Sequence, residues 1–183
     1  MPWVGLDALA KSNNIPREEV AETFAASTIS SAFERGHASD ADFLSELSRM
    51  FDLPETDIAA LWNSWVHPPY PGTLDALADL KTRFTTACLS NTNSLHWAHL
   101  NTMFKTDETF HFAFASHHMS AAKPDAEIYL KALGRMKCAP EDVWFFDDTE
   151  ANIDAARDVG LTAFHVDRGL GVLPVLRELN LIS

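Results

Sequence analysis

The 183-residue sequence is poor in cysteine and in positive charge, and it has no long apolar run. Two cysteines, Cys88 and Cys138, are too few for a disulfide scaffold and indicate reduced thiols, so we expect a cytoplasmic location. Acidic residues outnumber basic ones 26 to 14, and the formal charge of −12 opposes binding to nucleic acid or anionic lipid. No apolar stretch approaches membrane-spanning length, and residues 1–5 carry no basic flank of an export signal. We therefore expect a soluble protein with no nucleic-acid partner and no membrane partner.

The first third of the chain shows the spacing of apolar side chains that is typical of helices. Its clearest helix start is Ser39 followed three residues later by Asp42, a capping pattern that precedes an apolar stripe. Residues 67–72, with three prolines and a glycine, cannot continue a helix. We predict a helical unit at residues 1–67, a stiff connector at 68–72 and a second unit at 73–183.

Short apolar strands alternate with helices beyond the connector. We expect strands at residues 84–89, 112–115, 143–146 and 161–166. This alternation predicts right-handed crossovers and an α/β fold with a parallel sheet. Four consecutive apolar residues at 143–146 predict a strand that is buried on both faces.

Polar residues stand where these strands end. Asp147 and Asp148 follow the strand at 143–146, and two adjacent carboxylates would repel unless they share a proton or a cation. Their hard oxygen ligands favour Mg²⁺, although the same pair could instead cap the next helix. Ser90 and Asn91 follow an earlier strand, and Lys123 precedes a proline at an expected helix start. A hydroxyl, an amide, an ammonium and a metal-binding acid pair together suit a phosphoryl group with Mg²⁺.

The order of these groups resembles the haloacid dehalogenase (HAD) superfamily. Three segments carry the resemblance: Leu89-Ser90-Asn91-Thr92-Asn93, then Lys123-Pro124 with Glu127-Ile128-Tyr129, and then Phe145-Phe146-Asp147-Asp148 with Asn152 and Ala155-Ala156. The similarity covers nearly the whole chain and is greatest to the subgroup with helical caps. It implies a HAD-like Rossmannoid parallel sheet with a small helical cap, and hydrolysis of a small phosphorylated or haloacid-type substrate.

The resemblance also implies a role for each matching residue. Lys123 and Asp147 would be catalytic, and Asp148, with Asp147 beside it, would bind Mg²⁺. Ser90, Asn91 and Lys123 would hold the phosphoryl oxygens. We expect Lys123 to pair with the acids when no ligand is present.

The sequence departs from the family at one point. Members of the superfamily begin with a hydrophobic strand that ends in an Asp-x-Asp signature, whose first Asp is the nucleophile. The sequence shows no such strand, and Asp7 lies in a helical pattern that indicates a surface residue. In the family that strand lies between those matching residues 85–89 and 143–147. We therefore expect weak Mg²⁺ binding, low activity, and two exposed strand edges that either pair directly or accept a second chain, as in a homodimer.

Three hypotheses about function remain open at this level. The first is a phosphatase-type or dehalogenase-type hydrolase that lacks its first strand in the recorded sequence. The second is a non-catalytic protein of the same fold that acts as a binding or interaction protein. The third is a receiver-like signalling domain, but there the acid doublet precedes the lysine, whereas Lys123 precedes Asp147 in this chain.

Overall fold

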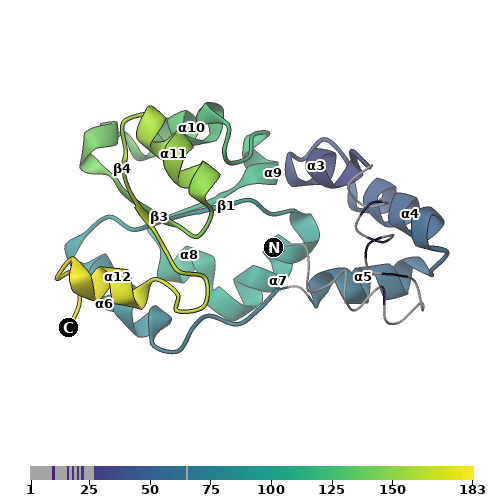
Figure 1. The fold of residues 1–183 in the computed structure, drawn as a ribbon, viewed down its shortest axis with the longest axis horizontal. Coiled ribbons are helices and arrows are strands. Elements are labelled where there is room, and N and C mark those ends of the chain that lie inside the picture. Colours follow the sequence, from purple (N-terminus) through teal and green to yellow (C-terminus); the bar gives the residue numbers. More distant parts are fainter. Residues whose placement is uncertain are drawn as a thin grey trace.

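The computed structural model describes residues 10, 16, 18, 20, 22, 27–64 and 66–183. Figure 1 shows a group of helices at one end of the molecule and alternating strands and helices at the other. The helical group contains α3 (Ile29–Glu34), α4 (Asp40–Phe51) and α5 (Glu55–Asn63). The second unit contains, in chain order, α6 (Thr73–Arg83), β1 (Ala87–Ser90), α7 (Ser94–Phe104), α8 (Thr106–Thr109), β2 (Phe112–Ala115), α9 (Ser116–Met119), α10 (Ala126–Met136), a 3-10 turn (Pro140–Asp142), β3 (Trp144–Asp147), α11 (Glu150–Asp158), β4 (Thr162–His165) and α12 (Leu173–Glu178). No helix in the described ranges is long and apolar enough to cross a membrane.

The capping pattern predicted at the start of α4 is confirmed. The Ser39 hydroxyl accepts a hydrogen bond from the Asp42 backbone N–H at 3.1 Å, and the Asp42 carboxylate accepts one from the Ser39 backbone N–H at 3.1 Å. The two residues thereby satisfy backbone groups that the first turn of a helix leaves without partners. The helix ends at Phe51, and the C-cap residue Asp52 has a left-handed φ of 52° that stops the helix before Pro54.

Aromatic side chains form the core of the helical group. The Phe33 and Phe43 rings stack with their centroids 4.3 Å apart, and the Trp62 ring lies 4.7 Å from Phe43. Trp62 is buried and belongs to this core. Asp7, which the sequence pattern indicated as a surface residue, lies outside the described residues, as does Trp65.

The four predicted strands are present and run parallel in pairs. β1 pairs with β2 from Ala87 opposite Phe112, and β3 pairs with β4 from Trp144 opposite Thr162. The pairs remain two separate two-stranded sheets instead of the one continuous sheet that the alternation predicted. Within the described residues, β1 and β3 therefore use one edge each for backbone hydrogen bonds. Direct pairing of the two strands, one of the ways we expected the gap to close, does not occur.

The best-packed part of this unit lies between the strands and two helices. α10 and α11 cover one side of the strands, and α6 and α12 lie on the other (Figure 1). The core on the first side consists of Phe114, Met119, Ala121, Ile128, Tyr129, Ala132, Leu133, Ile153, Ala156, Leu161 and Ala163. β3 is less buried than predicted, because Trp144 is 47% exposed and Phe145 and Phe146 are half-buried. A strand with a neighbour on one edge only loses the packing that a second neighbour would provide.

Two details near α10 differ from the sequence-based expectation. Pro124 does not open the helix, because α10 begins at Ala126 and Asp125 occupies the N-cap position. Leu130, an apolar residue of the same helix, is 56% exposed. After the end of α11, Gly160 has a left-handed conformation, with a φ of 95°.

Polar contacts attach the helical group to the strand unit. Trp62 Nε1 donates to Asn93 Oδ1 at 3.4 Å, and His96 Nε2 lies 2.8 Å from the Trp62 carbonyl oxygen. Arg35 and Asp125 form an ion pair at 2.6 Å across the same junction. Burial lowers the pKa of His96, and its hydrogen bond to the Trp62 backbone opposes that shift.

The junction should weaken in mild acid. A folded pKa below the ordinary value of 6.5 means that the unfolded chain binds protons first, so stability falls as pH drops below that value. We expect wild type to lose more free energy of unfolding between about pH 7.5 and about pH 5 than His96→Gln does, measured by urea denaturation. His37→Gln, at an exposed site, is the control and should follow wild type. Equal losses in wild type and His96→Gln would contradict the prediction.

Candidate functional site

A buried ion pair lies where the two pairs of strands come together. Lys123 follows α9, Asp147 ends β3, and Lys123 Nζ lies 2.6 Å from Asp147 Oδ2. The two side chains are only 11% and 7% exposed. The predicted pairing of Lys123 with the acids is therefore present. Charges this deeply buried need both a partner and further hydrogen bonds to offset their lost hydration.

Hydrogen bonds complete the surroundings of Asp147. Its second oxygen, Oδ1, accepts from the Thr149 backbone N–H and from Asn152 Nδ2, both at 2.9 Å. The Tyr129 hydroxyl donates to the Asn152 carbonyl oxygen at 2.9 Å and so fixes the first turn of α11. The capping alternative is not confirmed, because Thr149 is the N-cap residue of α11 and no side chain caps the first turn of that helix. The Asp147 carboxylate also neutralises Lys123.

Asn91 holds the backbone at Lys123. Its side-chain Nδ2 donates to the Lys123 carbonyl oxygen at 2.8 Å, and its Oδ1 accepts from the Lys123 backbone N–H at 2.8 Å. The amide therefore links the end of β1 to the lysine that reaches β3. Ser90 is the last residue of β1, and its hydroxyl has no hydrogen bond to any described residue.

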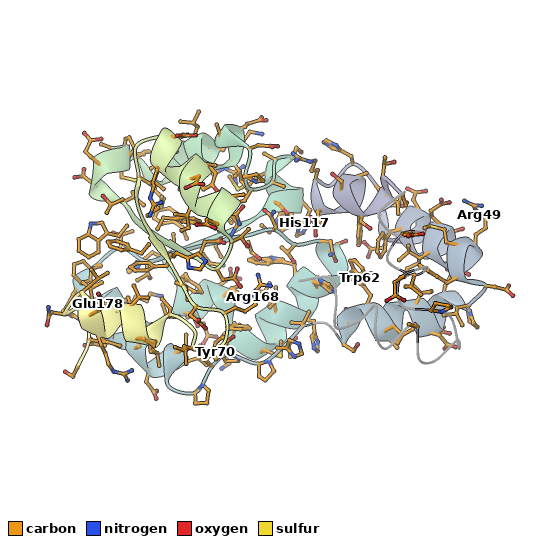
Figure 2. The ribbon with its side chains drawn as sticks, viewed as in Figure 1. Arg49, Trp62, Tyr70, His117, Arg168 and Glu178 are labelled. Carbon is orange, nitrogen blue, oxygen red and sulfur yellow. The ribbon has the colours of Figure 1, made fainter. Side chains whose placement is uncertain are left out.

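A second ion pair lies beside the first. Arg168 Nε donates to Asp148 Oδ2 at 2.5 Å, and the two side chains are 39% and 38% exposed. This hydrogen bond lowers the pKa of Asp148, while burial of the carboxylate opposes the shift. Figure 2 shows Arg168 in the middle of the strand unit. Sequence reasoning missed Arg168, although it follows β4 just as the other site residues follow their strands.

The charges of the site balance, and its oxygen donors suit Mg²⁺. Lys123 and Arg168 carry two positive charges against the two negative charges of Asp147 and Asp148. The described part of the chain contains no group of three or more His, Cys, Asp or Glu residues that could hold a metal ion. Mg²⁺ often binds through one or two carboxylates, with water and substrate oxygens filling its other positions. The acid pair fits that mode of binding and predicts weak affinity for the metal alone.

Comparison with known proteins places the chain in a family. A family model described as a haloacid dehalogenase-like hydrolase matches residues 8–160. The chain belongs to the haloacid dehalogenase-like hydrolases. This membership supports the resemblance that the three sequence segments carried.

Solved HAD structures have the same fold. An enzyme of the family from Bacteroides thetaiotaomicron, in complex with magnesium and inorganic phosphate, is 25% identical with a TM-score of 0.84, covering 94% of this chain and 90% of that one. A predicted HAD-like hydrolase from Porphyromonas gingivalis is 22% identical with a TM-score of 0.83, covering 98% and 90% of the two chains. An L-2-haloacid dehalogenase from Xanthobacter autotrophicus, with chloropropionic acid covalently bound, is 18% identical with a TM-score of 0.65, covering 100% and 78%. The expected HAD-like α/β fold is thereby confirmed.

Curated relatives of the chain are much longer than it is. Bifunctional epoxide hydrolase 2 from Rattus norvegicus is 30% identical over 115 residues, which are 60% of this chain and 20% of that protein. The protein of the same name from Mus musculus is 29% identical over 115 residues, with the same coverage. The HAD-like chain therefore spans about a fifth of the length of these relatives.

Breaking the buried pair from the lysine side should be costly. We expect Lys123→Met to lower the free energy of unfolding by about 3 kcal/mol, because it leaves the buried Asp147 carboxylate without a cation. The double variant Lys123→Met/Asp147→Leu should recover much of that loss, since no buried charge remains. Lys105→Met removes a lysine that is 69% exposed in its ion pair and should cost less than about 1 kcal/mol. Urea denaturation measures all three, and equal effects of the two single variants would show that the buried pair has no special role.

Proposed function

We propose that the chain is a phosphatase-type member of the family that binds a small phosphomonoester together with Mg²⁺. The observation that carries the proposal is the buried Lys123–Asp147 pair, held by Asn91 at the carboxyl ends of the strands. In open α/β sheets, ligands bind at those ends. The related enzyme that was solved with magnesium and inorganic phosphate supports the choice of ligand.

Each residue of the site would have its own part in binding. Lys123 presents its ammonium to the phosphoryl oxygens, and the free hydroxyl of Ser90 donates to one of them. Asn91 keeps the lysine backbone in place, and Asp147 holds the ammonium. Asp148 supplies the carboxylate for Mg²⁺, which polarises a phosphoryl oxygen when bound.

Charge balance predicts how the two ligands bind. The site is neutral without ligands, because its two cations match its two carboxylates. Mg²⁺ alone would leave two excess positive charges and a phosphate dianion two excess negative charges, whereas both ligands together restore neutrality. Each ligand should therefore favour the binding of the other.

Calorimetric titration tests this coupling. We expect saturating inorganic phosphate to raise the Mg²⁺ affinity on the order of tenfold or more, and saturating Mg²⁺ to raise the phosphate affinity by the same factor. Asp148→Asn should abolish the coupling, because it removes the metal ligand. Asp154→Asn, on the exposed side of α11, loses the same charge and should keep it. Independent binding of the two ligands by wild type would rule out the proposed site.

We infer that the part of the chain that the structure describes lacks a carboxylate nucleophile. No Asp-x-Asp in the sequence follows an apolar strand, because Asp40-Ala41-Asp42 opens the helix α4. Asp147 is bonded to Lys123 and to the start of α11, and neither contact leaves it free to attack a substrate. We propose that the 183-residue chain alone binds phosphate but hydrolyses phosphomonoesters slowly.

An assay on a generic phosphomonoester with Mg²⁺ tests the catalytic part. We expect the chain to be slower by several powers of ten than a version extended at its N-terminus by an apolar strand that ends in Asp-x-Asp, because loss of a covalent nucleophile costs about that much. The matched control is the same extension with Asn in place of the first Asp. Rapid turnover by the unextended chain that Asp148→Asn abolishes would mean that another residue acts as nucleophile.

The free strand edges favour the alternative function, a non-catalytic protein that binds a partner. In the described residues, β1 and β3 each leave one edge without backbone hydrogen bonds, and such edges attract further strands. A second copy of the chain is the partner that needs no other component. Sedimentation equilibrium on the assayed sample shows whether an inactive chain forms a homodimer, which is the result expected if the partner is a second copy.

A further inference from the structure

The loop that carries Arg168 is held by its own turn. Asp167 Oδ1 accepts hydrogen bonds from the Gly169 backbone N–H at 2.7 Å and from the Leu170 backbone N–H at 3.2 Å. The carboxylate thereby closes the loop on itself directly after β4. Arg168 lies within this turn, and its side chain reaches Asp148.

Tyr70 holds the same loop from outside. It comes from the connector between the helical group and the strand unit, and its hydroxyl donates to the Arg168 carbonyl oxygen. Gly171 has a φ of 70°, and a Cβ there would lie 2.9 Å from the Tyr70 ring. Only a glycine at this position lets the Tyr70 ring pack this closely, so the ring lies directly against the loop. Figure 2 shows both Tyr70 and Arg168 on the α12 side of the strands.

The two ion pairs of the site differ in how easily a ligand can replace them. Lys123 and Asp147 are at most 11% exposed, and Asp147 has two further donors. Arg168 and Asp148 are 39% and 38% exposed, and ion pairs as accessible as this one are weak. A divalent cation can therefore compete for Asp148 far more easily than for Asp147.

We propose that Arg168 is an exchangeable counterion, which holds Asp148 while no metal is bound and transfers to an oxygen of the phosphate once Mg²⁺ occupies that carboxylate. The inference rests on the proposed function and adds a residue to its binding site. The guanidinium suits both partners, because its planar set of N–H donors matches carboxylate and phosphate oxygens. Since Tyr70 and Asp167 hold the loop in place, Arg168 stays close to the site after it leaves Asp148.

Calorimetric titrations of Arg168→Ala and Arg49→Ala test the exchange. Arg49 lies on α4 at the far end of the molecule (Figure 2) and is 72% exposed, so its replacement makes the same change in net charge without touching the site. We expect Arg168→Ala to bind Mg²⁺ on the order of fivefold more tightly than Arg49→Ala, because the metal no longer competes with the guanidinium. At saturating Mg²⁺, Arg168→Ala should bind phosphate about tenfold more weakly than Arg49→Ala.

The outcomes separate this inference from the function on which it rests. Equal Mg²⁺ and phosphate affinities in the two variants would overturn the exchange, while coupled binding by wild type would leave the proposed function intact. Absence of Mg²⁺ and phosphate binding in wild type would overturn both. Tyr70→Phe removes only the hydroxyl that holds the loop, and we expect it to weaken phosphate binding at saturating Mg²⁺. Unchanged phosphate affinity in Tyr70→Phe would contradict the proposal even if Arg168→Ala failed to fold.

Discussion

The buried ion pair between Lys123 and Asp147 is the contact on which the strand unit depends. Backbone hydrogen bonds join β1 to β2 and β3 to β4, but in the described residues none joins one pair of strands to the other. The Lys123 side chain reaches Asp147 at the end of β3. The Asn91 side chain hydrogen-bonds the Lys123 backbone and so links it to the end of β1. The Lys123–Asp147 ion pair thus links the two pairs of strands at a place where a continuous sheet would have backbone hydrogen bonds. Because both charges are largely buried, neither can be lost without leaving the other uncompensated.

The same contact divides the site into a fixed part and an exchangeable part. Both carboxylate oxygens of Asp147 accept hydrogen bonds, and Tyr129 supports this arrangement through Asn152. Asp148 is the next residue, yet its partner Arg168 comes from a loop after β4 and is much more exposed. Adjacent carboxylates therefore meet different surroundings, and only the exposed one is suited to change partners.

Membership of the haloacid dehalogenase-like hydrolases explains the arrangement of the helices and strands. The reaction itself depends on the residues of the site. The helical group lies against the strand unit through Trp62 and His96, and its capped helix α4 begins at this junction, where Ser94 donates to Asp40. The carboxyl ends of the strands hold cations and carboxylates in equal number, which suits a metal and a phosphate that bind together. In the described residues, β1 and β3 each keep one edge without backbone hydrogen bonds, so a partner strand could bind at the place where the catalytic segment of the family would lie.

The sequence alone determined whatever depends on neighbours along the chain. The capping residues of α4 and the strand at residues 112–115 follow from local patterns, and the pairing of Lys123 with the acids followed from a family resemblance. Only the tertiary structure decided that the strands form two separate pairs, that Trp144 is half exposed and that Arg168 joins the site. Those features depend on contacts between distant segments, such as the hydrogen bond from Tyr70 to Arg168 across 98 positions of sequence. A periodic pattern shows which face of a strand is apolar, but whether another strand lies beside it is settled in three dimensions.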